Sequence, residues 1–250
     1  MPELIELRRV ERTCVVSFQR EQKLNAISQQ VERELIEALG ASELHDAACV
    51  VFTGGPRVFS AGADLNEMQG LDPASIVSYY EGSGDFAERV ADLPQPTFSA
   101  ISGYCLGGGF ELALATDFRI ADRTAIFGLP EVGLGILPSS GGTHRLVQMF
   151  GPVRAKELIL LRDRLWAEDA FRIGLITELV DEGEALSSAL AHAERLAGLP
   201  QLAVRVTKRV IDAMAGGRRA SGLELERLGY GLLAQTPEAD EQTGARLKPR

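Results

Sequence analysis

The chain has 250 residues, of which 45% are hydrophobic and 24% are charged, the composition of a globular protein with a substantial core. Its formal net charge is −9, so it is not expected to bind nucleic acid through its overall field. The three cysteines lie far apart in the sequence and have no zinc-like spacing with the three histidines, so no metal site is expected.

The N-terminal residues and the hydropathy of the chain indicate its cellular location. Residues 1–16 contain acidic side chains and lack the apolar core of a secretory signal, and they are not the Ser- and Arg-rich sequence of a transit peptide. No stretch reaches the ~18 consecutive apolar residues that a membrane-spanning helix requires. We therefore expect a cytoplasmic protein without a membrane partner.

Short apolar runs bounded by turn residues predict the strands of a sheet. In chain order they are residues 4–7, 14–18, 50–53, 97–101, 118–120 and 125–127. A charged turn near Glu11 joins the first two runs. Between the second and third runs, Ser28 has the character of a helix N-cap, and Val31, Leu35 and Leu39 follow it at helical spacing.

Helices dominate the rest of the chain. Residues 72–93 predict a loosely held helix, because Gly82 and Gly84 interrupt it. Residues 110–115 predict a short apolar helix, and residues 152–161 predict one with proline in its first turn. Strands that alternate with helices in this way indicate an α/β fold.

Two apolar stripes at helical spacing occupy the last part of the chain. They comprise Leu186, Ala189, Leu190, Ala193 and Leu196 in the first stripe, and Val206, Val210 and Met214 in the second. We divide the chain into an α/β core at residues 1–161, which carries the site, and a helical C-terminal region at residues 162–250.

Gly107, Gly108 and Gly109 stand between an apolar strand and the short helix at 110–115. Glycines at such an entrance let a ligand approach the backbone, and they leave N–H groups exposed at the positive end of the helix dipole. A second turn, at residues 61–63, could supply another N–H group, and two such groups aimed at one point stabilise an oxyanion. Close packing of helix against strand would explain the glycines equally well.

Two glutamates follow these glycines. Glu111 lies in the first turn of the apolar helix, where the dipole can stabilise its charge, yet a buried helix rarely carries a carboxylate without a partner or a task. Glu131 follows a strand and Pro130, whose restricted φ fixes the backbone direction. Considered alone, Glu131 is explained most simply as a surface charge at the end of a loop.

Three segments resemble the signature of the enoyl-CoA hydratase/isomerase (crotonase) superfamily. They are SAGADL at 60–65, GYCLGGGFELALATDFRIA at 103–121 and FGLPEVGLGILPSSGGTHRL at 127–146. Residues 20–27 resemble the N-terminal CoA-binding turn of the family, and residues 167–180 resemble its helix–turn near the trimer contact. The resemblance implies a crotonase-like α/β spiral of ββα units, followed by a helical C-terminal trimerisation region.

The resemblance also implies roles for individual residues. The backbone N–H groups of Ala63 and Gly108 would form the oxyanion hole for the thioester carbonyl. Glu111 and Glu131 correspond to the two glutamates that hydratases of this family use together. The positions that correspond to CoA contacts are Lys23 and Ala26 in the early segment, and Ala61, Asp64 and Leu65 in the turn beside the adenine and pantetheine.

The sequence departs from the family pattern at three positions. Glu21 stands where proline is frequent, so a looser turn is expected there. Ser139 stands where glycine is common, which predicts a reshaped acyl pocket. Thr243 stands in a short tail at a position often held by glutamate, so contacts from this tail to the CoA phosphates are not assumed.

The predicted reaction is syn addition of water to a trans-2-enoyl-CoA thioester. Glu131 would donate a proton to C2 while Glu111 activates the water, and no cofactor or metal is needed because CoA is part of the substrate. Two other functions stay open: a Δ3-Δ2-enoyl-CoA isomerase, which needs one carboxylate, and a non-catalytic acyl-CoA-binding subunit, which needs neither. A dehydrogenase is disfavoured, because the glycines lack the G-x-G-x-x-G spacing.

The resemblance further implies a homotrimer or a dimer of trimers. The two C-terminal apolar stripes agree with this expectation, because each must be covered by the body of the protein or by another subunit. The expected partners are therefore an acyl-CoA thioester and other copies of the same chain.

Overall fold

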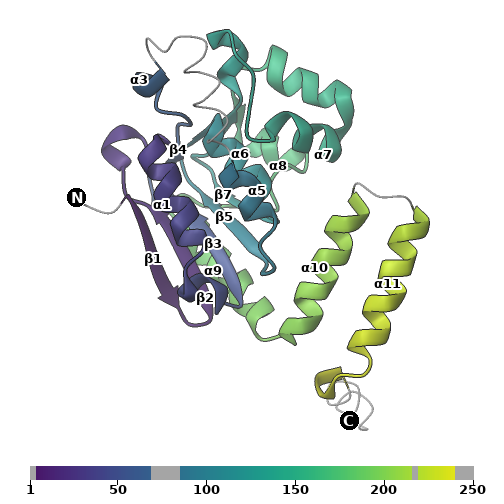
Figure 1. Ribbon diagram of the computed structural model, residues 1–250. Helices are drawn as coiled ribbons and strands as arrows, with labels where there is room; N and C mark the ends of the chain where they lie inside the picture. The colour runs from purple at the N-terminus through teal and green to yellow at the C-terminus, as the bar shows by residue number, and fades with distance from the viewer. Residues whose placement is uncertain (1–3, 69–84, 216–218, 240–250) are drawn as a thin grey trace.

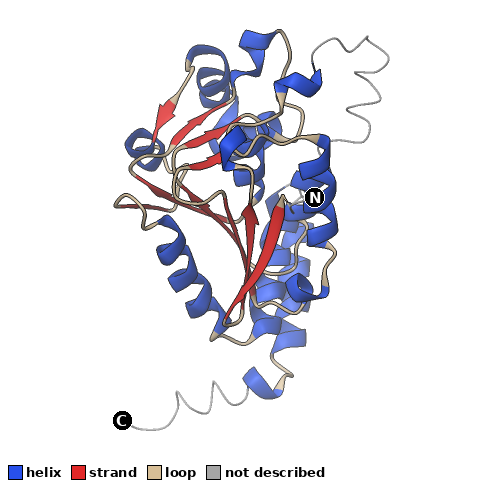
Figure 2. Cartoon of the chain, turned by 90° about the vertical axis from the view of Figure 1, so that its left-hand side faces the viewer, coloured by secondary structure: helices blue, strands red, loops and turns tan. Residues whose placement is uncertain are grey.

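The computed structural model describes residues 4–68, 85–215 and 219–239 (Figure 1). Two sheets lie at its centre with helices around them, and a helical hairpin extends away from this body near the C-terminal end. Helices lie on both sides of the larger sheet (Figure 2). None of the helices in the described ranges is long and apolar enough to cross a membrane.

The larger sheet, within the described residues, has the order β1-β2-β3-β5-β7-β10. Its strands are β1 Ile5–Val10, β2 Thr13–Phe18, β3 Cys49–Thr53, β5 Thr97–Ile101, β7 Phe118–Asp122 and β10 Glu178–Val180. The first two strands form an antiparallel hairpin around Glu11, and the other neighbours are parallel. β3 and β5 are buried throughout, which explains why their sequences are largely apolar, with no charged residue.

The smaller sheet has the order β4-β6-β8-β9. Its strands are β4 Val58–Ser60, β6 Tyr104–Leu106, β8 Ile126–Gly128 and β9 Leu165–Trp166. The chain passes from a strand of the larger sheet into one of the smaller sheet at β3–β4, at β5–β6 and at β7–β8. A helical segment follows each of these steps, so the predicted spiral of ββα units is confirmed.

The helices surround these sheets. Their bounds are α1 Gln29–Leu39, α2 Ser42–His45, α3 Leu65–Met68, α5 Asp85–Ala91, α6 Gly108–Ala115, α7 Gly142–Lys156, α8 Ala167–Arg172, α9 Ala185–Ala197, α10 Gln201–Ala215 and α11 Arg219–Leu233. Three tighter or wider helical turns are η1 Glu21–Lys23, η2 Pro130–Leu134 and the π-helical η3 Glu157–Leu161. The predicted N-cap of α1 is confirmed, because the Val31 N–H donates to Ser28 Oγ at 3.2 Å.

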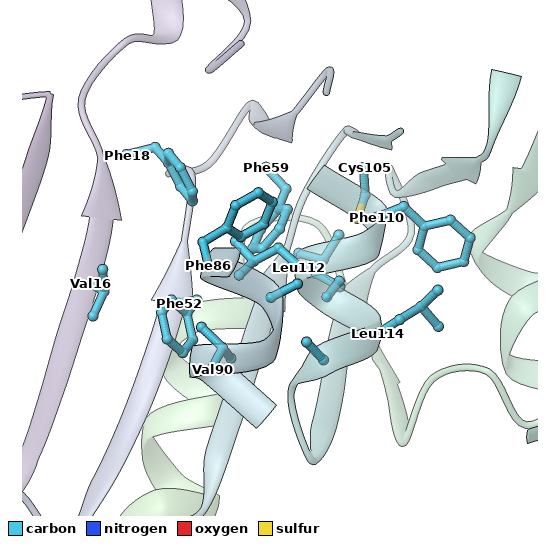
Figure 3. Packing of buried hydrophobic residues seen from close by; sticks show 14 of the residues in the cluster. Val16, Phe18, Phe52, Phe59, Phe86, Val90, Cys105, Phe110, Leu112 and Leu114 are labelled. Carbon is cyan, nitrogen blue, oxygen red and sulfur yellow. The ribbon is translucent and has the colours of Figure 1, made fainter. Parts of the chain in front are cut away.

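The helix α6 lies in the middle of the main apolar core (Figure 3). All of its residues from Gly109 to Ala115 are buried. Phe110 packs against Phe127 of β8 with ring centroids 5.5 Å apart, and Leu112 is fully buried. A helix buried all round cannot shift without opening cavities, so its N-terminal turn is held in a fixed place.

The helix predicted at residues 152–161 is present, but the helical segment before it, residues 142–150, was not predicted. α7 begins at Gly142 and is kinked at Gly151, where φ is 77°, so Pro152 does begin a new turn. Residues 157–161 complete it as the π-helical turn η3. Of the predicted helix at 72–93, the structure describes α5; the interrupting glycines lie outside the described residues.

A helical segment was predicted after residue 161, but this segment also contains two short strands. β9 pairs with β8, and β10 pairs with β7, so both sheets end on strands from this segment. Such short strands have too few residues for an alternating pattern to be visible in sequence. The division at residue 161 stays a prediction.

The two C-terminal stripes meet different surroundings. Ala189 and Ala193 of α9 are fully buried against the larger sheet, so the first stripe covers the body. In α10, Val206 and Val210 face Gly229 of α11, where an added Cβ would lie 3.3 Å from Val206 Cγ1, so the second stripe lies inside the helical hairpin.

Candidate active site

A cavity of about 310 Å³ lies where the N-terminus of α6 meets the turn after β4 and the helical turn η2. Its walls come from η1, the turn after β4, α6, η2 and the loop before α7. Every residue predicted for the site lines this cavity: Lys23, Ala26, Ala61, Ala63, Asp64, Leu65, Gly108, Glu111 and Glu131. The fold therefore gathers residues from four separate stretches of the sequence.

The turn after β4 approaches the start of α6 closely. Gly62 has φ of 88°, and a Cβ there would lie 2.8 Å from the Leu106 carbonyl oxygen and 3.2 Å from the Gly108 nitrogen. Glycine is therefore required both by the backbone conformation and by the space. Ile27 pairs with the turn on both sides of Ala63, so the Ala63 N–H points away from it.

The first turn of α6 presents unpaired backbone donors to the cavity. Gly107 caps the helix with φ of 50° and gives its own N–H to the Gly128 carbonyl at 2.9 Å. Among the described residues, the N–H groups of Gly108 and Ala63 have no hydrogen-bond partner. The cavity thus holds two backbone donors from touching turns, one of them at the positive end of a buried helix.

Glu111 is 2% exposed, and it is held by the loop before α7. Its Oε1 accepts hydrogen bonds from the backbone N–H groups of Ser140 at 2.8 Å and of Gly142 at 2.9 Å. Burial raises the pKa of Glu111, whereas these N–H groups and the charge of Arg145 oppose the rise. The carboxylate is therefore fixed through Oε1 by the backbone of this loop.

Glu131 is the second buried carboxyl group of the cavity, at 9% exposed. Its Oε2 is buried and has no hydrogen-bond partner within the described ranges. Burial raises the pKa of Glu131 to about 7, and the nearby charge of Glu111 adds to the rise. Because Glu131 lacks the N–H donors that hold Glu111, it is the member of the pair better suited to carry a proton near neutral pH.

The amino-acid sequence matches the family model described as enoyl-CoA hydratase/isomerase over residues 8–245. The chain belongs to this family. A probable enoyl-CoA hydratase of Rhizobium meliloti (strain 1021) is 37% identical over 243 residues, which cover 96% of this chain and 93% of that protein. A crotonyl-CoA hydratase of Syntrophomonas wolfei is 34% identical, with 99% of this chain and 96% of that protein covered. The solved structure of an enoyl-CoA hydratase from Bacillus anthracis has a TM-score of 0.92 at 35% identity and covers 97% of this chain and 95% of that one.

These similarities confirm the family, the crotonase-like fold and an enzyme of the enoyl-CoA hydratase type. They also support an acyl-CoA thioester as the substrate class, because the family and its named hydratases share it. The roles of the individual site residues stay predictions, as does the absence of a cofactor.

Asp64 lines the cavity of this enoyl-CoA hydratase/isomerase family member, but its side chain is already engaged. Its carboxylate accepts from Arg20 Nη1 at 2.8 Å and from Asn66 Nδ2 at 2.9 Å. Burial alone would raise the pKa of Asp64, but the hydrogen bonds from Asn66 and Arg20 outweigh burial and lower it. The carboxylate therefore fastens the turn after β4 to η1, while Lys23 and Leu65 are exposed at the rim of the cavity.

The looser turn expected at Glu21 is not observed. Asn25, which is fully buried, accepts the Arg20 N–H through Oδ1 at 3.0 Å and donates to the Val58 carbonyl at 2.9 Å. One side chain thus replaces the stiffness that a proline would have given. Thr243 lies outside the described residues.

The loop that holds Glu111 was not predicted from the sequence. Ser140 and Gly142 contribute only backbone N–H groups, which no residue type reveals. The signal that could have located them is Gly141, which has φ of 92°, followed by Gly142, where a Cβ would lie 2.9 Å from Glu111 Cγ. Ser139 lines the cavity beside them, as its predicted effect on the pocket requires.

Proposed function

We propose that the protein is a 2-enoyl-CoA hydratase, which adds water in the syn sense across the double bond of a trans-2-enoyl-CoA thioester. The observation that carries the proposal is the presence of two buried glutamates, Glu111 and Glu131, in a cavity with two unpaired backbone N–H groups. A binding protein has no need of two buried carboxyl groups, since each costs free energy to bury.

The thioester carbonyl oxygen is proposed to lie between the N–H groups of Ala63 and Gly108. Donors at this point withdraw electron density from the conjugated double bond and make C3 electrophilic. They also stabilise the enolate oxygen that forms when water adds, and each such donor contributes about 3 kcal/mol in comparable sites. The support is geometric: the two turns approach each other closely, Ala63 and Gly108 both line the cavity, and neither N–H has a hydrogen-bond partner among the described residues.

The glutamates are proposed to divide the proton transfers. Glu111, held as a carboxylate by two N–H groups, takes a proton from the water that attacks C3. Glu131, whose pKa is raised to about 7, delivers a proton to C2 of the enolate. Because the hydroxyl group at C3 and the proton at C2 are added to the same face of the double bond, the addition is syn. Proton exchange with solvent then returns Glu111 to its carboxylate form and Glu131 to its protonated form.

The acyl group and the assembly state belong to the proposal as well. Similar proteins are named crotonyl-CoA hydratase in one case and 2,3-dehydroadipyl-CoA hydratase of Escherichia coli (strain K12) in another, which supports hydration without fixing a chain length. A homotrimer or a dimer of trimers is supported by exposed apolar side chains on the hairpin α10–α11, including Ile211 and Leu228. The proposal requires no metal or redox cofactor, and it keeps the cytoplasm as the expected location.

The test compares a trans-2-enoyl-CoA with the 3-enoyl-CoA of the same length on the purified protein. Loss of the conjugated thioester absorbance and formation of the 3-hydroxyacyl-CoA are expected for the first substrate. Faster conversion of the 3-enoyl thioester to its 2-enoyl isomer would make the protein an isomerase, and turnover of neither would make it a binding subunit. The variant Glu37→Gln, at an exposed position on α1, serves as a control for loss of a glutamate.

A further inference from the structure

Arg145 connects the surface of the protein to the loop that holds Glu111. It lies in the first turn of α7, and its side chain is only 11% exposed. Nη1 donates to the Ser140 carbonyl oxygen at 2.9 Å, and Nη2 donates to Glu88 Oε1 on α5 at 2.7 Å. The guanidinium group thus binds the loop through Nη1 and the neighbouring helix α5 through Nη2.

Ser140 is fixed from both sides by these contacts. Its N–H donates to Glu111 Oε1 at 2.8 Å, while its carbonyl accepts from Arg145. The next residue, Gly141, has φ of 92°, a conformation that side chains rarely adopt and that allows the loop to turn back within three residues. A loop built on glycines has little stiffness of its own, so the hydrogen bond from Arg145 acts together with the bonds to Glu111 to immobilise it.

We propose that Arg145 is a positioning residue for Glu111: it fixes Ser140, whose N–H in turn fixes the carboxylate that activates water. This inference rests on the proposed function for the role of Glu111. Arg145 itself does not line the cavity, so it acts through the loop and through its charge, without touching the substrate.

The charge of Arg145 acts in the same direction as the hydrogen bonds. It opposes the rise that burial causes in the pKa of Glu111. The other charged groups around this carboxylate are acidic, except for Lys23 at the rim of the cavity. They are Glu131 on η2, Glu32 on α1 and Asp64 in the turn after β4, with Lys23 at the rim, and Glu88 beyond Arg145. Removal of Arg145 would therefore leave Glu111 harder to ionise and less firmly oriented.

The test combines kinetics with a titration that does not depend on activity. Arg145→Met should lower kcat by about 100-fold, the effect of misplacing a catalytic group by about 1 Å. It should leave KM nearly unchanged and move the acidic limb of the kcat/KM profile to higher pH by about one unit. Carboxyl ¹³C resonances of labelled glutamate, with Glu111 assigned through Glu111→Gln, should show the same rise in the pKa of Glu111.

Three further variants separate positioning from simple loss of structure. Arg145→Lys keeps the charge but loses the fork, so it should restore the acidic limb and recover kcat only partly. Glu88→Ala should have a small effect, because Glu88 is 69% exposed and the bond from Arg145 to Ser140 remains. Arg154→Met is the matched control on α7, beyond the kink at Gly151, where the arginine pairs with Glu157.

Each outcome decides the proposal. An unchanged pKa of Glu111 in Arg145→Met would overturn it even if activity fell, and so would unchanged kinetics or a failure of both Arg145 variants to fold. If the wild type did not hydrate any enoyl-CoA while the pKa of Glu111 still rose in Arg145→Met, the proposed function would be wrong and the positioning role would stand.

Discussion

The substitution Glu131→Gln should separate the contribution of this side chain to stability from its contribution to catalysis. Burial raises the pKa of Glu131 from its ordinary value of 4.5 to about 7. For an acid, a raised pKa in the folded state means that folding is penalised once the group must ionise. The penalty is absent below pH 4.5, grows between pH 4.5 and 7, and is complete above pH 7.

The magnitude follows from the size of the shift. One pKa unit corresponds to about 1.4 kcal/mol, so ionised Glu131 lowers the free energy of unfolding by at most about 3 kcal/mol at high pH. Glutamine cannot ionise, and any cost of burying its amide is independent of pH. The stability of Glu131→Gln relative to the wild type should therefore rise by about 3 kcal/mol from acidic to alkaline pH.

The assay is thermal unfolding of both proteins across this pH range at fixed protein concentration. For a chain of this size, about 3 kcal/mol corresponds to a change in the Tm difference of about 6–12 °C. Parallel Tm curves for the variant and the wild type between pH 4.5 and 8 would refute the reasoning, because the carboxyl group would then ionise normally in the folded protein. Glu37→Gln, at an exposed position, controls for removal of a carboxyl group as such.

Glu131→Gln should also lose turnover by about 10²–10⁴-fold while it still binds the CoA thioester. Normal hydration by the folded variant would show that Glu131 does not transfer a proton in the reaction. Glu111→Gln should lose hydration similarly; retention of 3-enoyl isomerisation in that variant would support the proposed division between the two glutamates. Gly108→Val should fold, since a Cβ there meets only Ile27 Cδ1 at 3.6 Å. Its kcat/KM should fall by about 10²–10³-fold, because the side chain would intrude where the thioester oxygen is proposed to bind the Gly108 N–H. Light scattering at micromolar concentration should give a multiple of the 27.0 kDa chain mass; a fully active monomer would contradict the proposed assembly.

The local elements could be predicted from the sequence because their causes are local. Short, largely apolar runs marked β3 and β5, and the side chain of Ser28 marked the start of α1. Pro152 marked a new helical turn, but the segment of α7 before Gly151 was missed because its apolar face is weak and its N-cap is a glycine. The short β9 and β10 were missed because pairing with β8 and β7, and no property of their own sequence, makes them strands.

The sequence by itself determined which residues are unusual: glycines before a helix, a glutamate inside an apolar helix, and a glutamate behind a proline. Only the tertiary structure decided what they do together, because their meeting in one cavity depends on strand pairing across the whole chain. The tertiary structure also decided the different pKa values of the two glutamates. Glu111 and Glu131 are the same residue type, and burial, the backbone N–H groups of Ser140 and Gly142 and the charge of Arg145 make their environments differ.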